Sequence, residues 1–353
     1  MFDKDEQDEM PRGPQSYPRA KNPADTDRTP SSARRTPGSV QALSKLPQTL
    51  LRGVDGLLLR LLGDYAPMLR SNKPLLFGLA GFLAAALGAI LAEFVPHFRW
   101  SDARLGEGLY AALYSCVAAS FLSAGLYVAG EYYLRRLELD WQTLMKPFLA
   151  GAVAGAIAGG VAGFLYGATH IVEYWREVLL RPACWGVLGG LVGCRLAAST
   201  PNLGYARASA GGALGGAVGG FAFVFIAILM PQFLGRIAGF GVMGGALGLA
   251  FVAADAVFRD AELEVIWAPN ETATIRLGER PIYIGGGDDH VSIPGLAEHA
   301  IAIVFESGKI RYIDRATGRK TDLKDGSNIA IGRVRLVIHA RKLAQNAKTN
   351  VER

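Results

Sequence analysis

Apolar residues in the middle of the chain form long, nearly uninterrupted segments. Five of these segments, at about 75–95, 109–131, 148–169, 208–231 and 235–257, have the composition of membrane-spanning helices. A helix rises 1.5 Å per residue, so about 20 apolar residues cross a hydrocarbon core of about 30 Å. A sixth segment, 178–198, contains Arg181, Pro182 and Arg195, and its two arginines are far enough apart to reach opposite interfaces. We therefore predict an α-helical polytopic membrane bundle of six spans over residues 74–258.

Glycine recurs at every fourth position within two of the predicted spans. These glycines are Gly151, Gly155, Gly159, Gly163 and Gly167 in the third span, and Gly211, Gly215 and Gly219 in the fifth. Helices in lipid associate through close backbone approach, which a stripe of glycines permits. The spacing predicts glycine-zipper packing of the bundle. The alternative is that the stripes let helices slide or line a narrow pore.

The segments before the first span are polar or amphipathic. Residues 1–40 carry many charges and prolines and almost no aliphatic side chains, which predicts a disordered cytoplasmic tail. Residues 48–65 place leucines at helical spacing, with the charged side chains outside that stripe. We predict an amphipathic interfacial helix over residues 43–72, which either lies on the lipid surface of the membrane or packs against the membrane domain.

Composition and charge agree with a membrane protein. Half of the 353 residues are apolar, 44 are glycine, and 19% are charged, against about 25% in an average soluble chain. The net charge of +6 is explained by basic residues that flank the spans, and we predict no binding of nucleic acid. The flanking basic residues on the side of the termini are Lys45, Arg52, Arg60, Arg70, Lys73 and Arg259. This bias predicts a multi-pass protein of the cell inner membrane with both termini in the cytoplasm.

After Arg259 the pattern changes to short apolar runs separated by turn signals. Two runs, 310–314 and 334–340, alternate apolar and polar residues as antiparallel strands with one wet face do. Gly285-Gly286-Gly287, Thr317-Gly318 and Asp325-Gly326 mark turns. We predict an all-β sandwich domain over residues 260–345, with one strand over 329–338.

Four short motifs in this region follow one another in a recognisable order. They are Ile284-Gly285-Gly286, Asp288-Asp289-His290-Val291-Ser292-Ile293, Glu298-His299-Ala300 and the strand that ends at Asp314. Over residues 262–341 this order resembles a forkhead-associated (FHA) domain. The resemblance implies an eleven-stranded sandwich whose apical loops bind phosphothreonine peptides, and it implies that His299 braces the fold.

The chain departs from the FHA pattern at the residues that would bind phosphate. The phosphate-binding arginine of the family aligns with Gly286, its phosphate-binding serine with Leu296, and its peptide-clamping asparagine falls near Arg319. Because a phosphate site needs charge-assisted donors, we expect a degenerate FHA-like module that binds an unphosphorylated protein. Arg315, Arg319 and Lys320 either form a solvated turn or supply substitute charge on the same face, which leaves phosphothreonine binding as the alternative.

The sequence contains no recognisable constellation of catalytic or metal-ligating residues, so we predict no enzyme, cofactor or metal. Cys116, Cys184 and Cys194 lie in apolar segments without a CxxC pair and are expected to be small core residues. We predict a membrane-anchored scaffold whose cytoplasmic FHA-like domain recruits a protein partner, with homo-oligomerisation left open. The alternative is a channel or transporter whose gating or assembly this domain regulates.

Overall fold

The computed structural model describes residues 66–96, 103–136, 141–168, 176–269, 271–287 and 289–340. The predicted tail at 1–40 and residues 43–65 of the predicted amphipathic helix lie outside these ranges. The described remainder of that helix is α2 (Ala66–Ser71). Asn72 separates α2 from the next helix. It caps the N-terminus of that next helix, because the Asn72 side chain accepts a hydrogen bond from the backbone N–H of Leu75 at 3.0 Å.

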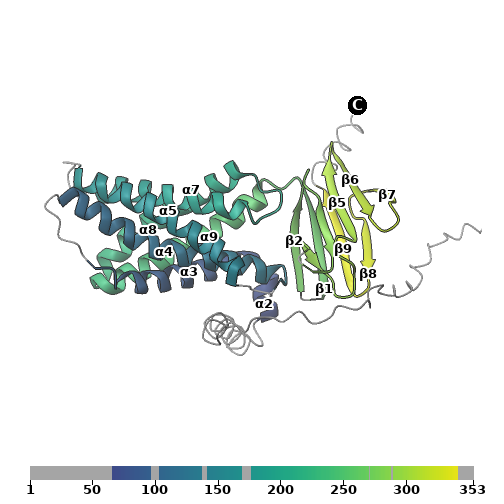
Figure 1. The fold of residues 1–353 in the computed structure, drawn as a ribbon, viewed down its shortest axis with the longest axis horizontal. Coiled ribbons are helices and arrows are strands. Elements are labelled where there is room, and N and C mark those ends of the chain that lie inside the picture. Colours follow the sequence, from purple (N-terminus) through teal and green to yellow (C-terminus); the bar gives the residue numbers. More distant parts are fainter. Residues whose placement is uncertain are drawn as a thin grey trace, which may run out of the picture. The chain divides into compact units, whose positions relative to one another are not determined.

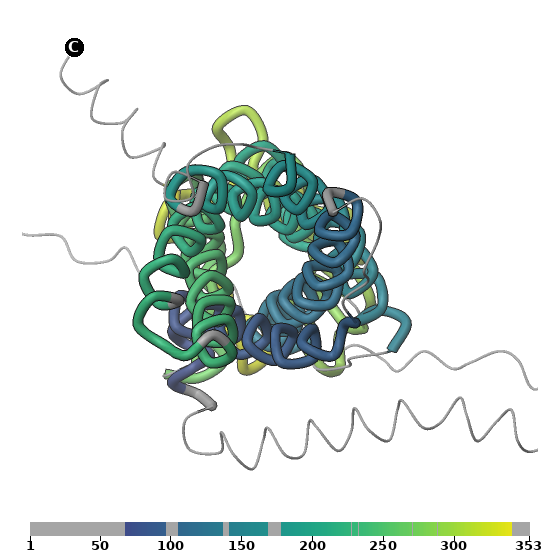
Figure 2. The backbone as a smooth tube through the Cα atoms, turned by 90° about the vertical axis from the view of Figure 1, so that its left-hand side faces the viewer, coloured from purple at the N-terminus to yellow at the C-terminus, as the bar shows by residue number. Residues whose placement is uncertain are grey.

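Six α-helices of 17 to 31 residues follow α2 within the described ranges. They are α3 (Lys73–Ala92), α4 (Ala103–Tyr133), α5 (Trp141–Ala168), α7 (Arg181–Ala197), α8 (Tyr205–Leu229) and α9 (Gln232–Val257), and the short π-helix η2 (Arg176–Leu180) leads into α7. Each helix contacts the one before it and the one after it, and α9 returns to contact α3. The six helices therefore form a closed ring, which Figure 2 shows in a view along the helices.

Five of the six helices are long and apolar enough to cross a membrane, which indicates a membrane protein. The exception is α7, which has 17 residues, begins at Arg181 and carries Arg195 in its last turn. The outer surface of the ring exposes many large apolar side chains. On α5, for example, Leu149, Val153 and Ile157 are each more than half exposed. Lipid is the solvent that suits such a surface, since soluble monomers rarely expose large contiguous apolar patches.

The contact between α4 and α5 is made by the backbones of the two helices. A Cβ atom added to Gly151, Gly155 or Gly159 would collide with a carbonyl oxygen of α4. Those oxygens belong to Ala119, Ser115 and Ala111, so each step of four residues along α5 matches a step of four back along α4. Gly163 meets the carbonyl oxygen of Glu107 in the same register, whereas Gly167 is exposed in the last turn of α5.

Helix α8 carries two rows of glycines, and each row contacts a different neighbouring helix. The predicted row faces α9, where Cβ atoms on Gly211, Gly215 and Gly219 would come within 3.0 Å of Ala254, Ala250 and Met243 respectively. A second row, Gly212 and Gly216, faces the backbone of α7. The four-residue spacing therefore coincides with close backbone contact on both sides of α8.

The C-terminal region forms two β-sheets (Figure 1). The described strands are β1 (Ala261–Ala268), β2 (Glu271–Leu277), β3 (Ile282–Gly285), β4 (Val291–Ser292), β5 (Ile301–Glu306), β6 (Lys309–Asp314), β7 (Lys320–Leu323), β8 (Asn328–Ile331) and β9 (Val334–Ala340). The four-stranded sheet has the order β2-β1-β9-β8 and the five-stranded sheet the order β4-β3-β5-β6-β7. Buried aliphatic side chains of both sheets, such as Leu263 and Ile303, belong to one core cluster.

The strand pattern differs from the sequence-based expectation in three ways. The described residues form nine strands, whereas the FHA resemblance implies eleven. The single strand predicted over 329–338 is a hairpin of β8 and β9, because Gly332 adopts a φ of +60° between them. The short strands β4 and β7 were not predicted. Both offer too few alternating residues for a period-2 pattern, and β7 is exposed along most of its length.

Polar contacts connect the helices to the first sheet. The hydroxyl of Tyr133, at the end of α4, accepts a hydrogen bond from the backbone N–H of Thr274 in β2 at 2.7 Å. Asn202, in the loop between α7 and α8, exchanges hydrogen bonds with the backbone of Arg280 at 3.0 and 3.1 Å. These contacts tie the loop after α7 and the end of α4 to the same part of the β region.

Candidate ligand cavity and candidate peptide-binding face

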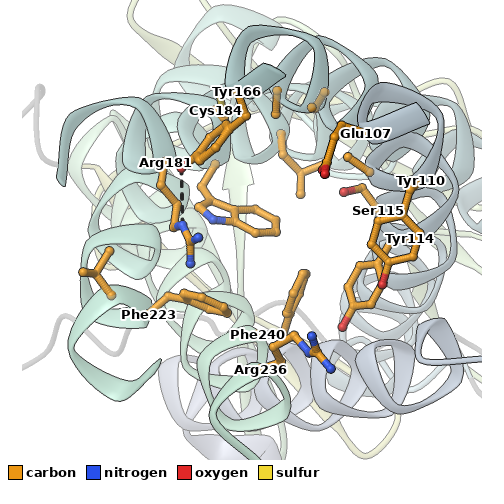
Figure 3. Close-up of a pocket in the computed structure, with 18 of the residues that line it drawn as sticks. Glu107, Tyr110, Tyr114, Ser115, Tyr166, Arg181, Cys184, Phe223, Arg236 and Phe240 are labelled. Atoms are coloured by element: carbon orange, nitrogen blue, oxygen red, sulfur yellow. Dashed lines mark hydrogen bonds between the residues drawn. The ribbon is translucent and has the colours of Figure 1, made fainter. Parts of the chain in front are cut away.

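A cavity of about 710 Å³ lies inside the helical ring (Figure 3). Its lining comes from the N-terminal parts of α4, α7 and α9, the C-terminal parts of α5 and α8, and η2. All of these segments meet at one end of the ring. The loop after α7, which contacts the β region through Asn202, and the C-terminal end of α9, which precedes β1, are at the opposite end. The volume falls within the range of about 300–1,000 Å³ that is usual for small-molecule sites.

Aromatic rings form the floor of the cavity. The ring of Phe240 lies edge-on to Trp185, with centroids 4.8 Å apart, and edge-on to Phe223 at 5.8 Å. Tyr114 continues the cluster, with its ring centroid 5.5 Å from that of Phe240, and Tyr110 lies beside Tyr114 at 6.0 Å. The four elements α4, α7, α8 and α9 thus supply one connected aromatic surface, which suits an apolar ligand.

An ion pair on one side of the cavity connects neighbouring helices of the ring. Arg236 in α9 donates a hydrogen bond from Nη2 to Oε2 of Glu93 at 2.8 Å, and its Nε lies 2.8 Å from Oε1. The Tyr114 hydroxyl donates to Oε1 of Glu93 at 3.1 Å. Glu93 caps the C-terminal end of α3, so this cluster joins α3, α4 and α9. The guanidinium of Arg236 is therefore committed to a structural contact.

Arg181 and Glu107 line the cavity from different helices, and Figure 3 shows both side chains pointing into it. Arg181 Nε donates to the Tyr166 hydroxyl at 3.4 Å, and its guanidinium lies 5.0 Å from the centroid of the Phe223 ring. Glu107 lies in the first turns of α4 and is exposed. A cationic group and an anionic group thus stand at the rim of an aromatic cavity.

The ring is filled by side chains between this cavity and the β region. Leu122, Leu126, Met243, Leu247 and Phe251 are each at most 1% exposed and belong to one core cluster. Beyond them, a second space of about 50 Å³ lies near Lys73 and Asp255. The large cavity is therefore separated from the opposite end of the ring by a packed apolar layer.

The candidate peptide-binding residues predicted from the sequence gather at one end of the five-stranded sheet. Ile284 pairs with Ile301, and Ile301 pairs with Asp314, so the loops after β3, before β5 and after β6 meet at this end. Within it, Gly286 N–H donates to the carbonyl oxygen of Ala297 at 3.0 Å. We call residues 286–287, 293–300 and 315–319 the loop end.

Gly286 and Leu296 are in direct contact at the loop end. A Cβ atom on Gly286 would collide with the carbonyl oxygen of Leu296. A side chain of any length at position 286 would therefore require the loop before β5 to move. Where the resemblance implies an arginine, the backbone of this chain leaves no room for one.

Buried polar groups brace the loop end. Asp289, 2% exposed, accepts a hydrogen bond from the backbone N–H of His299 at 2.7 Å and pairs with its ring Nδ1. The Tyr283 ring lies against the His299 ring with centroids 4.5 Å apart, and the backbone N–H of Tyr283 donates to Nδ1 of His290 at 3.2 Å. Burial, followed by the nearby charge of Arg136, lowers the pKa of His290 to about 4, so that His290 is neutral at pH 7.

Of the three predicted basic residues, Arg315 and Arg319 lie in the connection between β6 and β7, and Lys320 is the first residue of β7. Every residue from Arg315 to Lys320 is exposed. The guanidinium of Arg315 lies over the Tyr283 ring at 5.2 Å, next to the His299 ring. Arg319 lies in the β6–β7 turn, where its carbonyl oxygen accepts a hydrogen bond from the backbone N–H of Asp314 at 2.9 Å. Asp314 shapes this turn by accepting hydrogen bonds from the backbone N–H groups of Ala316 and Thr317 at 2.9 and 3.3 Å.

The sequence patterns gave no indication of the cavity in the ring. In the sequence, Arg181 was notable only as a charged residue within the apolar segment 178–198. Glu107, Trp185 and Phe240 belonged to no recognisable motif. No local pattern could have identified them, because their common orientation depends on closure of the ring.

Comparison of the chain with protein-family models, with curated proteins and with solved structures finds no match.

Proposed function

We propose that this protein is a membrane-anchored scaffold whose FHA-like domain binds a partner protein in the cytoplasm through the loop end. The helical ring is the anchor, with six spans and both termini on the cytoplasmic side. The observation that carries the proposal is the continuous exposure of Arg315 to Lys320 on a braced end of the β region. A rigid, basic and accessible loop face suits an acidic protein surface, because complementary charge gives specificity and fast association.

The contact between Gly286 and Leu296 favours a partner that is not phosphorylated. The backbone carbonyl of Leu296 occupies the space in which an arginine side chain would begin. Arg315 remains near this place, but its guanidinium lies over the Tyr283 ring. We therefore propose recognition of an acidic protein surface, with phosphothreonine dispensable.

Six spans are supported by the way α7 connects the two ends of the ring. Its first residue, Arg181, lines the cavity beside Tyr166 of α5. The loop that follows α7 is bound to the β region through Asn202. A helix of 17 residues covers about 26 Å at 1.5 Å per residue, and η2 adds further length, so arginines at both ends could reach the interfaces.

The experiment that tests this function is a binding assay with the full-length chain in nanodiscs as bait for cytoplasmic extract of the host. The variant Arg315→Glu/Arg319→Glu reverses charge at the loop end, while Lys309→Glu/Lys324→Glu makes the same change at the other end of the sheet. We expect a retained protein that survives phosphatase treatment, is lost with the first variant and is kept with the second. Equal retention by both variants, or loss after phosphatase treatment, would overturn the proposal.

The cavity favours a second candidate function, a transporter regulated by the FHA-like domain. Its aromatic and charged lining could hold a solute, but the packed layer around Leu122 and Phe251 blocks a continuous path in this conformation. Reconstituted proteoliposomes distinguish the two functions. Solute or ion flux that is lost when Ala162, which lines the cavity, is replaced by phenylalanine would favour the transporter over the scaffold.

A further inference from the structure

The six contacts around the helical ring are not equivalent. The glycines of α5 that line up in register, Gly151 to Gly163, all lie against α4, and the glycines of α7, such as Gly189 and Gly193, lie against α8. Close backbone contact at glycine also joins α8 to α9, α3 to α9, and α3 to α4. The contact between α5 and α7 differs from these contacts. Among the described residues, the glycine stripe of α5 lies against α4 and that of α7 lies against α8, so neither stripe lies between α5 and α7.

This α5–α7 contact borders the cavity. Ala162 and Tyr166 of α5 and Cys184 and Trp185 of α7 are all lining residues. A polar contact that bridges the two helices here, the hydrogen bond from Arg181 to Tyr166, is long at 3.4 Å. Immediately outside, α5 presents exposed apolar side chains, including Val161 at 53% and Phe164 at 50%. An opening between α5 and α7 would therefore lead from the cavity into the hydrocarbon region of the bilayer.

The chemistry of the cavity is that of an amphiphile site. Its floor is the aromatic surface of Trp185, Phe223 and Phe240, which would receive an apolar chain. Its rim carries Arg181, a donor that suits phosphate oxygens, and Glu107 with the neighbouring ring of Tyr110, which suit an ammonium group. Figure 3 shows Arg181 and Glu107 on different sides of the cavity, as a ligand with both charges requires.

We infer that the cavity binds a phospholipid with a zwitterionic headgroup, which enters from the bilayer between α5 and α7. The phosphate pairs with Arg181, the ammonium group pairs with Glu107, and one acyl chain lies against the aromatic floor. A lipid is favoured over a water-soluble ligand because most of the cavity wall is apolar and its least tightly packed side faces lipid. The inference concerns the membrane domain and does not depend on partner binding by the loop end.

The inference is tested by lipid binding to the purified full-length chain in detergent micelles, measured by native mass spectrometry. The probes are a phosphatidylethanolamine, a phosphatidylglycerol and free phosphoethanolamine. We expect the zwitterionic lipid to bind with the highest affinity, and free phosphoethanolamine to bind only weakly because it lacks the chain. Arg181→Gln and Glu107→Gln should each weaken binding of the zwitterionic lipid by about tenfold or more, as loss of a charge-assisted hydrogen bond does.

A pair of neighbouring residues on α5 provides the matched control. Ala162→Phe fills the cavity, whereas Val161→Phe places the same ring on the outward face of the helix. The first should abolish lipid retention and the second should leave it unchanged, with both variants eluting as the wild type does in size-exclusion chromatography. Tyr166→Phe removes the bridging hydrogen bond and should speed lipid exchange several-fold.

Four results would overturn the inference. They are stronger binding of phosphatidylglycerol, binding of free phosphoethanolamine as tight as that of the lipid, equal retention by the Ala162→Phe and Val161→Phe variants, and no lipid binding by the wild type. Glu107→Gln changes an exposed side chain, so its effect on binding can be measured even if Ala162→Phe fails to fold.

Discussion

The ammonium group of Lys73 lies 2.7 Å from Oδ2 of Asp255 and thereby joins the first residue of α3 to the last turn of α9. Arg259 donates to the same oxygen at 2.9 Å and also pairs with Glu262 in β1. The cluster therefore closes the ring and continues into the β region. Burial disfavours the charge of Arg259, but the carboxylates of Asp255 and Glu262 outweigh this effect and raise its pKa.

Asp255 should contribute more to stability than either of its cationic partners. Asp255→Asn leaves Lys73 and Arg259 buried without their common carboxylate, which costs roughly 3–5 kcal/mol for a broken buried pair. Lys73→Met leaves Asp255 paired with Arg259 and should cost less. Thermal unfolding of the chain in detergent measures the difference, and Glu306→Gln, in a surface pair, should cost no more than about 1 kcal/mol. A larger loss for Lys73→Met than for Asp255→Asn would show that the cluster is not centred on Asp255.

The backbone contact between α4 and α5 predicts that the glycine positions of α5 differ in how well they tolerate a larger side chain. Gly155→Val forces a side chain against the carbonyl of Ser115 and should destabilise the protein by about 1–3 kcal/mol or more. Gly167→Val introduces the same side chain at an exposed position in the last turn and should be nearly neutral. Unfolding temperatures in detergent provide the comparison. Equal tolerance at both sites would mean that α4 and α5 are not held at this distance.

His290 should make the β region less stable in mild acid. Because the pKa of His290 is about 4 in the folded chain and 6.5 when unperturbed, the unfolded state binds more protons between these values. Stability therefore rises with pH from about 4 to about 6.5, and is lost as the pH falls through that range. His290→Asn keeps an acceptor for the Tyr283 N–H and should flatten this dependence. His339→Asn, which alters a partly exposed histidine paired with Glu264, should keep it.

The proposed topology predicts a definite labelling pattern. In a chain whose native cysteines are replaced by alanine, a cysteine at exposed Lys324 should react with a membrane-impermeant thiol reagent only after the cells are opened. A cysteine at Phe94, which is 81% exposed beyond α3, should react in intact cells. If both positions react from the same side, the number of spans between them is not odd, which contradicts the proposed six spans. If only position 324 reacts in intact cells, the orientation is opposite to the proposed one.

The sequence was sufficient to predict the elements that depend on local pattern. The apolar segments correspond to the helices, and the four-residue spacing of glycine marks the faces of α5 and α8 where the backbones meet. Helix α5 nevertheless begins at Trp141, seven residues before the predicted start at 148, because Pro147 is accommodated inside the helix and does not begin it.

The cavity could not be predicted, because it is a property of the ring and not of any one helix. Glu107, Trp185 and Phe240 come from three helices that are distant in the sequence, and each is unremarkable in its own span. The space beside Gly286 is likewise closed by a residue from another loop. The blocking carbonyl belongs to Leu296, which lies between β4 and β5. The periodicity of apolar residues within one segment does not show which residues of different segments come into contact.

Partner binding through the loop end is the central claim, and site-specific photo-crosslinking in living cells of the host tests it most directly. A photoreactive amino acid is placed at Arg319, in the exposed turn after β6, or at Lys324, at the other end of the sheet. We predict a discrete crosslinked protein from position 319 that is absent from position 324 and that disappears when Arg315→Glu is added. The absence of a crosslink from position 319, or the same crosslinked protein from both positions, would contradict the account.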